Sequence, residues 1–190
     1  MTDHDQEPTG ISGLASDEPV LRPLWQYWIK RCRDRLCPAR SDIDPVDIPR
    51  LLPHIGLIDV ETDASRFRYR LIGTRLNEVF GKNFTGSYLD ESKNGQYAIF
   101  LHNLYAEAAR DRRGVFSETA FGYRDTRHLT VLRLILPLAE NDESPVTMLL
   151  FANTFRLREP GDPEVPDFDR AMPYLADDIV DIRSVAHHRL

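Results

Sequence analysis

Two arginines, Arg70 and Arg133, stand in apolar runs whose residues alternate as they do in strands. A guanidinium can hold a carboxylate or a phosphate through two parallel hydrogen bonds, so either residue could contact an anionic ligand. The structural alternatives are a salt bridge to an acid such as Asp59 or Glu118, or a side chain that reaches the rim of the sheet to keep its charge in water. We expect the structural role for both, because it is the commoner arrangement.

The sequence contains no recognisable catalytic set. A glycine-rich phosphate loop, a metal-binding helix of the His-Glu type and a nucleophile elbow are all missing. Asp59 and Glu61 belong to one predicted strand and Asp63 to the turn after it, so these acids are not paired for acid–base chemistry. We therefore predict no catalytic residues and no enzymatic activity. A small α+β enzyme with an unrecognised site stays open as an alternative.

The thiols and the terminal histidines do not form a predicted metal site. Cys32 and Cys37 lie five residues apart without further ligands at metal spacing, so neither a disulfide framework nor a zinc site is expected. Free thiols in a reducing cytoplasm are the expectation. His187 and His188 are adjacent at the chain end, where we expect a frayed terminus.

Length and composition predict one soluble domain with tails. The chain has 190 residues, 42% of them apolar, and a formal net charge of -6. A negative chain does not attract nucleic acid through bulk electrostatics, so no nucleic-acid partner is expected. The polar, acidic residues 1–19 predict a disordered leader and no secretory signal, and no run is long enough to span a membrane. A cytoplasmic location is the expectation.

Residues 67–86 organise the predicted domain, because a strand changes there directly into a short helix. Alternation places Phe67, Tyr69 and Leu71 on one face of the strand, and helical spacing follows until Gly81 ends the helix. Such a helix can wall a cavity over that face. The predicted ligand pocket is lined by Phe67, Tyr69, Leu71, Leu76, Phe80, Leu101 and Leu132, with His102 beside it and Arg70 and Arg133 as candidate polar contacts.

An N-terminal helix carries the largest predicted apolar stripe outside the pocket. Its members recur at three-to-four spacing: Leu21, Leu24, Trp25, Trp28, Cys32 and Leu36. Two outward-facing tryptophans would expose a large apolar area, so this helix must dock on its own domain or on a partner subunit. We expect Leu24, Trp25, Trp28 and Cys32 to form the docking face, with dimerisation through it.

The remaining elements are predicted from alternation and helical spacing. Strands are expected at 55–61, 66–73, 115–123, 128–138 and 146–154, a short helical turn at 45–52 and a long helix at 95–113. In the last two strands both faces are apolar, so both need a cover. Residues 156–166 predict a charged, proline-rich linker, and 167–190 predict a helix that ends the chain.

The order of these elements, with Trp25 and the runs PARSDIDPVDIPRLLPHIGLIDV and FRYRLIGTRLNEVFGKNFTG, resembles a PAS domain of the fifth, stand-alone bacterial group. The resemblance covers roughly residues 20–155. It implies an α+β fold with a five-stranded antiparallel sheet of order 2-1-5-4-3, whose helices cover a ligand pocket on one face. The N-terminal helix is then expected on the other face. Members of this group generally carry no output domain of their own.

The resemblance also limits which cofactors are expected. Light-sensing flavin domains of this fold keep a cysteine in an Asn-Cys-Arg-Phe-Leu-Gln segment, and the comparable residues 81–88 have none, so no flavin–thiol adduct is expected. Haem-binding PAS domains use a histidine on the long helix, where His102 lies one position past the apolar stripe. We expect a partly exposed helix histidine there, with haem as the weaker alternative. The cofactor is otherwise left open.

The resemblance implies a non-enzymatic sensor or adaptor in bacterial signalling. It would bind a small molecule or a signalling partner protein and act through homodimer contacts. The main alternative is a ligand-free scaffold whose side chains fill the pocket and which serves protein–protein interaction.

Overall fold

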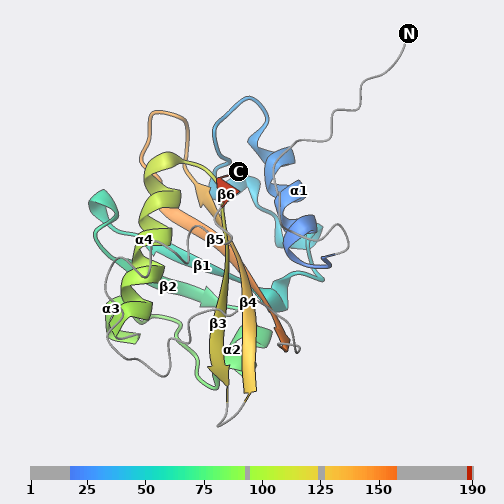
Figure 1. Ribbon diagram of the computed structural model, residues 1–190. Coiled ribbons are helices and arrows are strands. Elements are labelled where there is room, and N and C mark those ends of the chain that lie inside the picture. The colour runs from blue at the N-terminus through green and yellow to red at the C-terminus, as the bar shows by residue number, and fades with distance from the viewer. Residues whose placement is uncertain (1–17, 93–94, 124–126, 158–187, 190) are drawn as a thin grey trace.

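The alternating apolar segments form strands that pair into one antiparallel sheet in the computed structural model, which describes residues 18–92, 95–123, 127–157 and 188–189 (Figure 1). The strands are β1 (Ile55–Val60), β2 (Phe67–Ile72), β3 (Val115–Tyr123), β4 (Arg127–Leu138) and β5 (Met148–Leu157). Their order, β2-β1-β5-β4-β3, confirms the predicted α+β architecture.

A sixth strand was not predicted. The two-residue β6 (His188–Arg189) pairs antiparallel with Val115 and Phe116 at the outer edge of β3. The predicted terminal helix is therefore wrong at these two residues, and so is the predicted frayed end at His188. The rest of that predicted helix, most of the predicted linker and most of the predicted leader lie outside the described residues. The linker prediction is wrong at residues 156 and 157, which continue β5.

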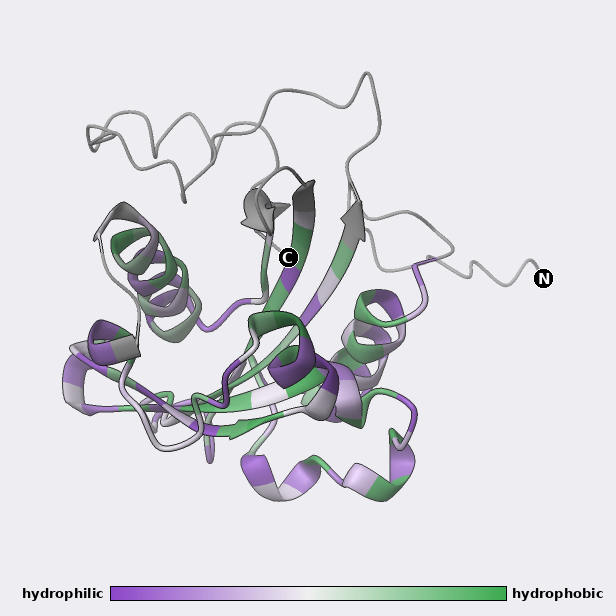
Figure 2. Ribbon diagram, turned by 90° about the horizontal axis from the view of Figure 1, so that it is seen from below, coloured by the Kyte–Doolittle hydropathy of each residue, from purple (hydrophilic) through white to green (hydrophobic). Residues whose placement is uncertain are grey.

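Three helices follow β2 in the chain: α2 (Thr74–Phe80), α3 (Leu89–Ser92) and α4 (Gly95–Asp111). Helix α4 packs across β3, β4 and β5, with Leu101, Leu104, Tyr105 and Ala108 buried at three-to-four spacing. Figures 1 and 2 show it on one side of the sheet, which we call the α4 face. Helix α2 ends at Gly81, whose φ of 66° is a conformation that glycine adopts without strain.

The N-terminal helix α1 (Leu21–Cys32) covers the other side of the same sheet, the α1 face (Figure 2). Trp25 and Trp28 are buried and stacked, with ring centroids 5.3 Å apart. The indole N–H of Trp28 donates to the carbonyl oxygen of Pro137 at 3.0 Å. The helix ends at Cys32, because Arg33 leaves the helical region with φ 54°. The predicted stripe is therefore too long, and Leu36 is 59% exposed.

Between α1 and β1 the proline-rich segment forms short 3₁₀ turns instead of the one predicted turn. These are η1 (Arg40–Asp42), η2 (Pro45–Asp47) and η3 (Leu52–His54). The Asp44 side chain accepts from the backbone N–H of Val46 at 2.9 Å, which caps η2 in front of Pro45. Another 3₁₀ turn, η4 (Thr62–Ala64), joins β1 to β2.

A β-bulge in β2 changes the face on which one predicted pocket residue lies. Tyr69 pairs with Ile58, but Leu71 pairs with Leu57, so Arg70 is the extra residue and the alternation restarts after it. Leu71 therefore lies on the α1 face with Leu57 and is 45% exposed. Its predicted position beside Phe67 and Tyr69 is wrong.

The register of β4 assigns its two apolar rows. Leu136 pairs with Leu150, which pairs with Leu57, so this row lies on the α1 face. The residues of β4 that alternate with this row lie on the α4 face. Arg133 is one of them, and its contact with Tyr97 of α4 shows the side. Leu132 shares the phase of Leu136 and is therefore on the α1 face. Its predicted position in the pocket is wrong, because alternation separates two rows without saying which helix covers each.

No helix in the described ranges is both long enough and apolar enough to cross a bilayer.

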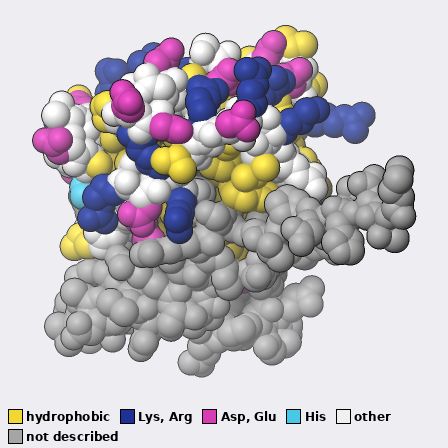
Figure 3. All heavy atoms as spheres, turned by 90° about the horizontal axis from the view of Figure 1, so that it is seen from above, with side chains coloured by type: hydrophobic (Ala, Val, Ile, Leu, Met, Phe, Trp, Pro, Cys, Tyr) yellow, Lys and Arg dark blue, Asp and Glu magenta, His cyan; other side chains and the backbone are white. Residues whose placement is uncertain are grey.

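On the side of the molecule seen in Figure 3, basic and acidic side chains are interspersed.

Candidate functional site

The most unusual side chain of the α4 face is Arg133, which is only 1% exposed. Its Nη1 donates to the hydroxyl of Ser117 at 3.1 Å and its Nη2 donates to the hydroxyl of Tyr97 at 3.0 Å. The ring of Phe100 lies 6.0 Å from the guanidinium carbon. Within the described ranges, no ion pair includes Arg133. A buried guanidinium is thus held by neutral groups, although arginines are almost never buried without a charged partner.

Arg133 is the middle of a polar row that crosses three strands. It pairs with Ser117 on β3 and with Asn153 on β5, so the three side chains lie side by side on the α4 face. All three are buried. The Oδ1 atom of Asn153 and the Oγ1 atom of Thr119, two residues beyond Ser117, have no hydrogen-bond partner among the described residues. Buried polar atoms normally have partners, so these two mark places where another molecule can bond.

Tyrosine hydroxyls complete this group, which we call the polar core cluster: Tyr69, Tyr97, Tyr105, Ser117, Thr119, Arg133 and Asn153. Tyr69 shares a hydrogen bond with Tyr105. Burial raises the pKa of Tyr105 to about 12 and that of Tyr69 well above its usual value, even though the charge of Arg133 acts in the opposite direction. Both phenols are therefore neutral at physiological pH and able to donate.

Most of the predicted pocket residues lie around this cluster. Phe67 and Leu101 are buried on the α4 side, and Phe67 meets the ring of Tyr105 edge-on at 5.4 Å. Leu76 of α2 is buried in the core. Phe80 is half-buried and contacts Phe155 edge-on at 5.8 Å. The structure brings Phe67, Phe80 and Leu101 to the face of the sheet that bears Tyr69 and Arg133, whereas Leu71 and Leu132 lie across the sheet.

Arg70 differs from Arg133 in its surroundings. It is exposed, and its Nε donates to Asp59, whose other carboxylate oxygen accepts from Arg68 at 2.8 Å. The expected salt bridge to Asp59 is therefore present for Arg70. For Arg133 the expectation of an ion pair or a rim position is wrong, since the side chain is enclosed and no described acid pairs with it.

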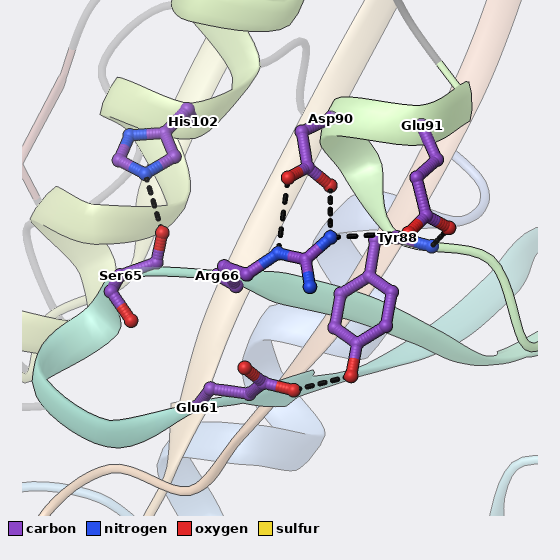
Figure 4. A network of polar contacts seen from close by, with 7 residues as sticks. All are labelled: Glu61, Ser65, Arg66, Tyr88, Asp90, Glu91 and His102. Atoms are coloured by element: carbon purple, nitrogen blue, oxygen red, sulfur yellow. Dashed lines mark hydrogen bonds and ion pairs between the residues drawn. The ribbon is translucent and has the colours of Figure 1, made fainter.

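His102 lies at the edge of the sheet rather than in the polar core cluster. Figure 4 shows its ring on α4 directed at the backbone of Ser65, with Nε2 at 3.3 Å from the carbonyl oxygen. Because a carbonyl oxygen only accepts, this contact places a proton on Nε2. Nε2 of His102 is thus bonded to the protein's own backbone and is not free to ligate an iron in this arrangement.

An ion-pair network fixes the same edge (Figure 4). Arg66 donates from Nε and Nη2 to both carboxylate oxygens of Asp90 at 3.0 Å, and to Glu91 at 3.2 Å. Its guanidinium carbon lies 3.7 Å from the centre of the Tyr88 ring, and the Tyr88 hydroxyl donates to Glu61. These contacts tie α3 to the β1–β2 hairpin.

The α1 face carries a separate apolar groove of about 400 Å³. Its lining comes from η1 to η3, β1, β2 and β5: Arg40, Ile43, Pro45, Ile48, Leu52, Pro53, Ile55, Leu57, Leu71, Ile72, Gly73, Thr74 and Leu150. The exposed Leu71 and Leu52 contribute apolar surface to it. The sequence analysis did not predict this groove, because the bulge that places Leu71 there leaves no signal in the alternation.

Helix α1 does not provide a free surface in this chain. Leu24, Trp25, Trp28 and Cys32 are buried against the chain's own sheet, so the docking that the sequence required is made in cis. Cys32 and Cys37 are both free and buried. Among the described residues, no group of three or more His, Cys, Asp or Glu is placed to hold a metal ion.

Sequence reasoning missed five members of the polar core cluster: Tyr97, Tyr105, Ser117, Thr119 and Asn153. A signal was present for the last three, because Ser117 and Thr119 lie in phase with the apolar Val115 in β3, and Asn153 interrupts the apolar run of β5. A polar residue at a core position of a strand needs a partner, and this pattern could have pointed to Arg133.

The comparisons with known proteins agree with this arrangement. A family model with the description "PAS domain" matches residues 16–151, well over half of the chain. No curated protein and no solved structure matches the chain. The matched range spans α1, the sheet up to β5 and all the helices that cover it. The chain therefore belongs to the PAS domain family.

Proposed function

We propose that this protein is a non-enzymatic sensor or adaptor in bacterial signalling that binds a small molecule on its α4 face. Membership of the PAS family supports a role in signalling as sensor or adaptor. The ligand, the dimer contacts and the cytoplasmic location are the further parts of the proposal.

The observation that carries the proposal is the polar core cluster. Arg133, Ser117 and Asn153 are buried side by side, and the Oδ1 of Asn153 and the Oγ1 of Thr119 are unpartnered. A core built only for stability would favour apolar residues at these positions, because polar groups without partners destabilise the folded state. Retaining them is understandable if a ligand completes their hydrogen bonds.

Signal output is proposed to proceed through subunit contacts on the α1 face. Leu52 and Leu71 expose apolar side chains beside the groove, and Val46 of the neighbouring η2 turn is 81% exposed. A second copy of the chain is the proposed occupant, because exposed apolar patches of this kind mark interaction surfaces. Ligand binding can shift such an association only by its differential affinity for the two states.

A ligand-free scaffold is the second candidate, and the groove is the observation in its favour. In that case the groove binds a signalling partner protein and the polar core cluster has no ligand. Native mass spectrometry of gently purified protein separates the candidates, because it reports bound small molecules and subunit number in one measurement.

The sensor proposal expects a small-molecule mass that is lost on denaturation, and a subunit equilibrium that changes when the compound is removed and added back. A protein that carries no compound, gains no thermal stability from any metabolite class and keeps one association state would contradict sensing and favour the scaffold. Turnover of a bound compound would instead support an enzyme.

A further inference from the structure

We propose that the α4 face takes a small organic monocarboxylate, and that Arg133 forms the ion pair with it; this inference rests on the proposed sensing function and adds the chemical class of the ligand. The starting observation is charge. Arg133 is 1% exposed, and no described acid forms an ion pair with it. A guanidinium cannot lose its proton at any physiological pH, so an anion is the way to neutralise it in place.

The guanidinium of Arg133 has N–H donors left over for that anion. A guanidinium has five N–H donors, and here Nη1 and Nη2 each use one donor on the hydroxyls of Ser117 and Tyr97. These hydroxyls accept from arginine, and that of Ser117 can also donate its own proton to an oxygen nearby. Cation and donors are therefore gathered at one point, which is the arrangement that binds a carboxylate.

Two further atoms can bond to the body of the ligand. The hydroxyl of Thr119 has no partner and can donate, while the Oδ1 of Asn153 has no partner and can accept from a hydroxyl or N–H group. Both lie on the α4 face, Asn153 on β5 directly opposite Arg133 and Thr119 on β3 two residues beyond Ser117.

Charge number and surroundings favour a carboxylate over a phosphate. The cluster offers one permanent positive charge, which balances one carboxylate but leaves a doubly charged phosphate in excess. Aromatic rings lie beside the guanidinium: Phe100 is 6.0 Å from it and stacks on Tyr97 with centroids 6.4 Å apart. Further along α4, Tyr105 meets Phe67 of β2 edge-on. Such walls suit an apolar organic body rather than a bare inorganic ion.

The first test compares carboxylic acids with their own primary amides. Butyrate, benzoate and phenylacetate are each titrated against butyramide, benzamide and phenylacetamide, with phosphate and chloride as inorganic anions, and the melting temperature of the full chain is recorded. We expect at least one carboxylate to raise the melting temperature by about 3 °C or more at saturating concentration, and its amide to bind at least about tenfold more weakly.

Equal stabilisation by acid and amide, a larger effect of phosphate or chloride, or no effect of any carboxylate would each overturn the assignment. A neutral compound that binds and changes subunit association would also overturn it, while leaving the proposed sensing function intact.

The second test supplies the anion from the protein itself. In Asn153→Asp a carboxylate is placed opposite Arg133, so the ligand-free protein should melt at a higher temperature and should no longer respond to carboxylates. Asn83→Asp is the matched control, because it adds the same charge at an exposed site where the side-chain oxygen already accepts from Thr85. It should keep the full response.

Unchanged carboxylate binding by Asn153→Asp would contradict the ion pair. Arg133→Met should abolish the difference between acid and amide. If that variant does not fold, the comparison of acids with amides and the Asn153→Asp variant still decide the question.

Discussion

Trp28 on α1 and Pro137 on β4 are joined by a hydrogen bond of 3.0 Å from the indole N–H to the backbone carbonyl oxygen, across 109 residues of sequence. The contact is buried, and it fixes the first helix of the chain to the α1 face of the sheet. It also means that the helix is docked within one subunit.

Replacing Trp28 should therefore weaken the fold. Trp28→Phe keeps most of the apolar contact but leaves the Pro137 carbonyl without its donor, so we expect a loss of about 1–3 kcal/mol in the free energy of unfolding. Trp28→Ala should cost about 3–5 kcal/mol, because a cavity is added. Urea denaturation followed by circular dichroism measures both. Changes below about 0.5 kcal/mol in both variants would show that the helix is not docked.

Gly56 lies so close to Phe151 that any side chain there must displace the ring. A Cβ atom at Gly56 would be 2.4 Å from Cε1 of Phe151 and 2.8 Å from the carbonyl oxygen of Leu71. We expect Gly56→Ala to destabilise the protein by about 1–3 kcal/mol, and Phe151→Leu to relieve part of that loss in the double variant. Thermal or urea denaturation of the four proteins measures this coupling.

Gly81→Ala is the control for Gly56→Ala. Nothing lies within 4 Å of a Cβ at Gly81, so only its positive φ opposes a side chain, and a loss of about 1 kcal/mol is expected. If the stability losses of Gly56→Ala and Phe151→Leu simply add in the double variant, the steric account is contradicted.

The exposed groove on the α1 face should control self-association. Leu71→Glu introduces a charge at a side chain that is 45% exposed, so stability should change by no more than about 0.5 kcal/mol while a dimer is weakened at least tenfold. Ile99→Glu is the matched control, because Ile99 on α4 is 49% exposed and lies outside the groove. Sedimentation velocity of the wild type and the two variants measures this association. If both variants associate like the wild type, the proposed contact is refuted.

Stability should decrease at alkaline pH. Burial raises the pKa of the Cys32 thiol to about 12, and burial also raises the pKa of Cys37. Above a pH of about 9 the thiols of the unfolded chain lose their protons while those of the folded protein keep them, so the free energy of unfolding falls between about pH 9 and 12.

Urea denaturation under reducing conditions at pH 8 and pH 10 measures this loss, which should be smaller in Cys32→Ala. Equal losses in the wild type and in Cys32→Ala would exclude this thiol as a cause. The loss of stability should then come from Tyr105, whose pKa is also about 12, and the Tyr105→Phe variant should show a smaller loss.

The exposed salt bridge of Arg70 should matter little for stability. Arg70→Gln removes one of two arginines that share Asp59, at a side chain that is 54% exposed, so we expect a change of about 0–1 kcal/mol in the free energy of unfolding. The residual effect should diminish in 0.5 M salt. A loss above about 2 kcal/mol would mean that Arg70 has a role beyond this ion pair.

The sequence alone determined the order and type of the elements. Alternating or continuously apolar runs bounded by turn residues marked all five long strands, and helical spacing marked α1 and α4. The two long runs around β1 and β2 pointed to the PAS family that the family match shows. These features are local, since they depend on residues within a few positions of one another, and a single chain displays them directly.

Only the tertiary structure decided which side chains meet. Arg70 and Arg133 have the same pattern in sequence, yet one pairs with Asp59 in solvent and the other is enclosed beside Ser117. Leu71 changed faces through a single extra residue in β2, because each one-residue shift of register reverses the direction of every following side chain. Faces, partners and burial depend on contacts between distant segments, and alternation within one strand carries no information about them.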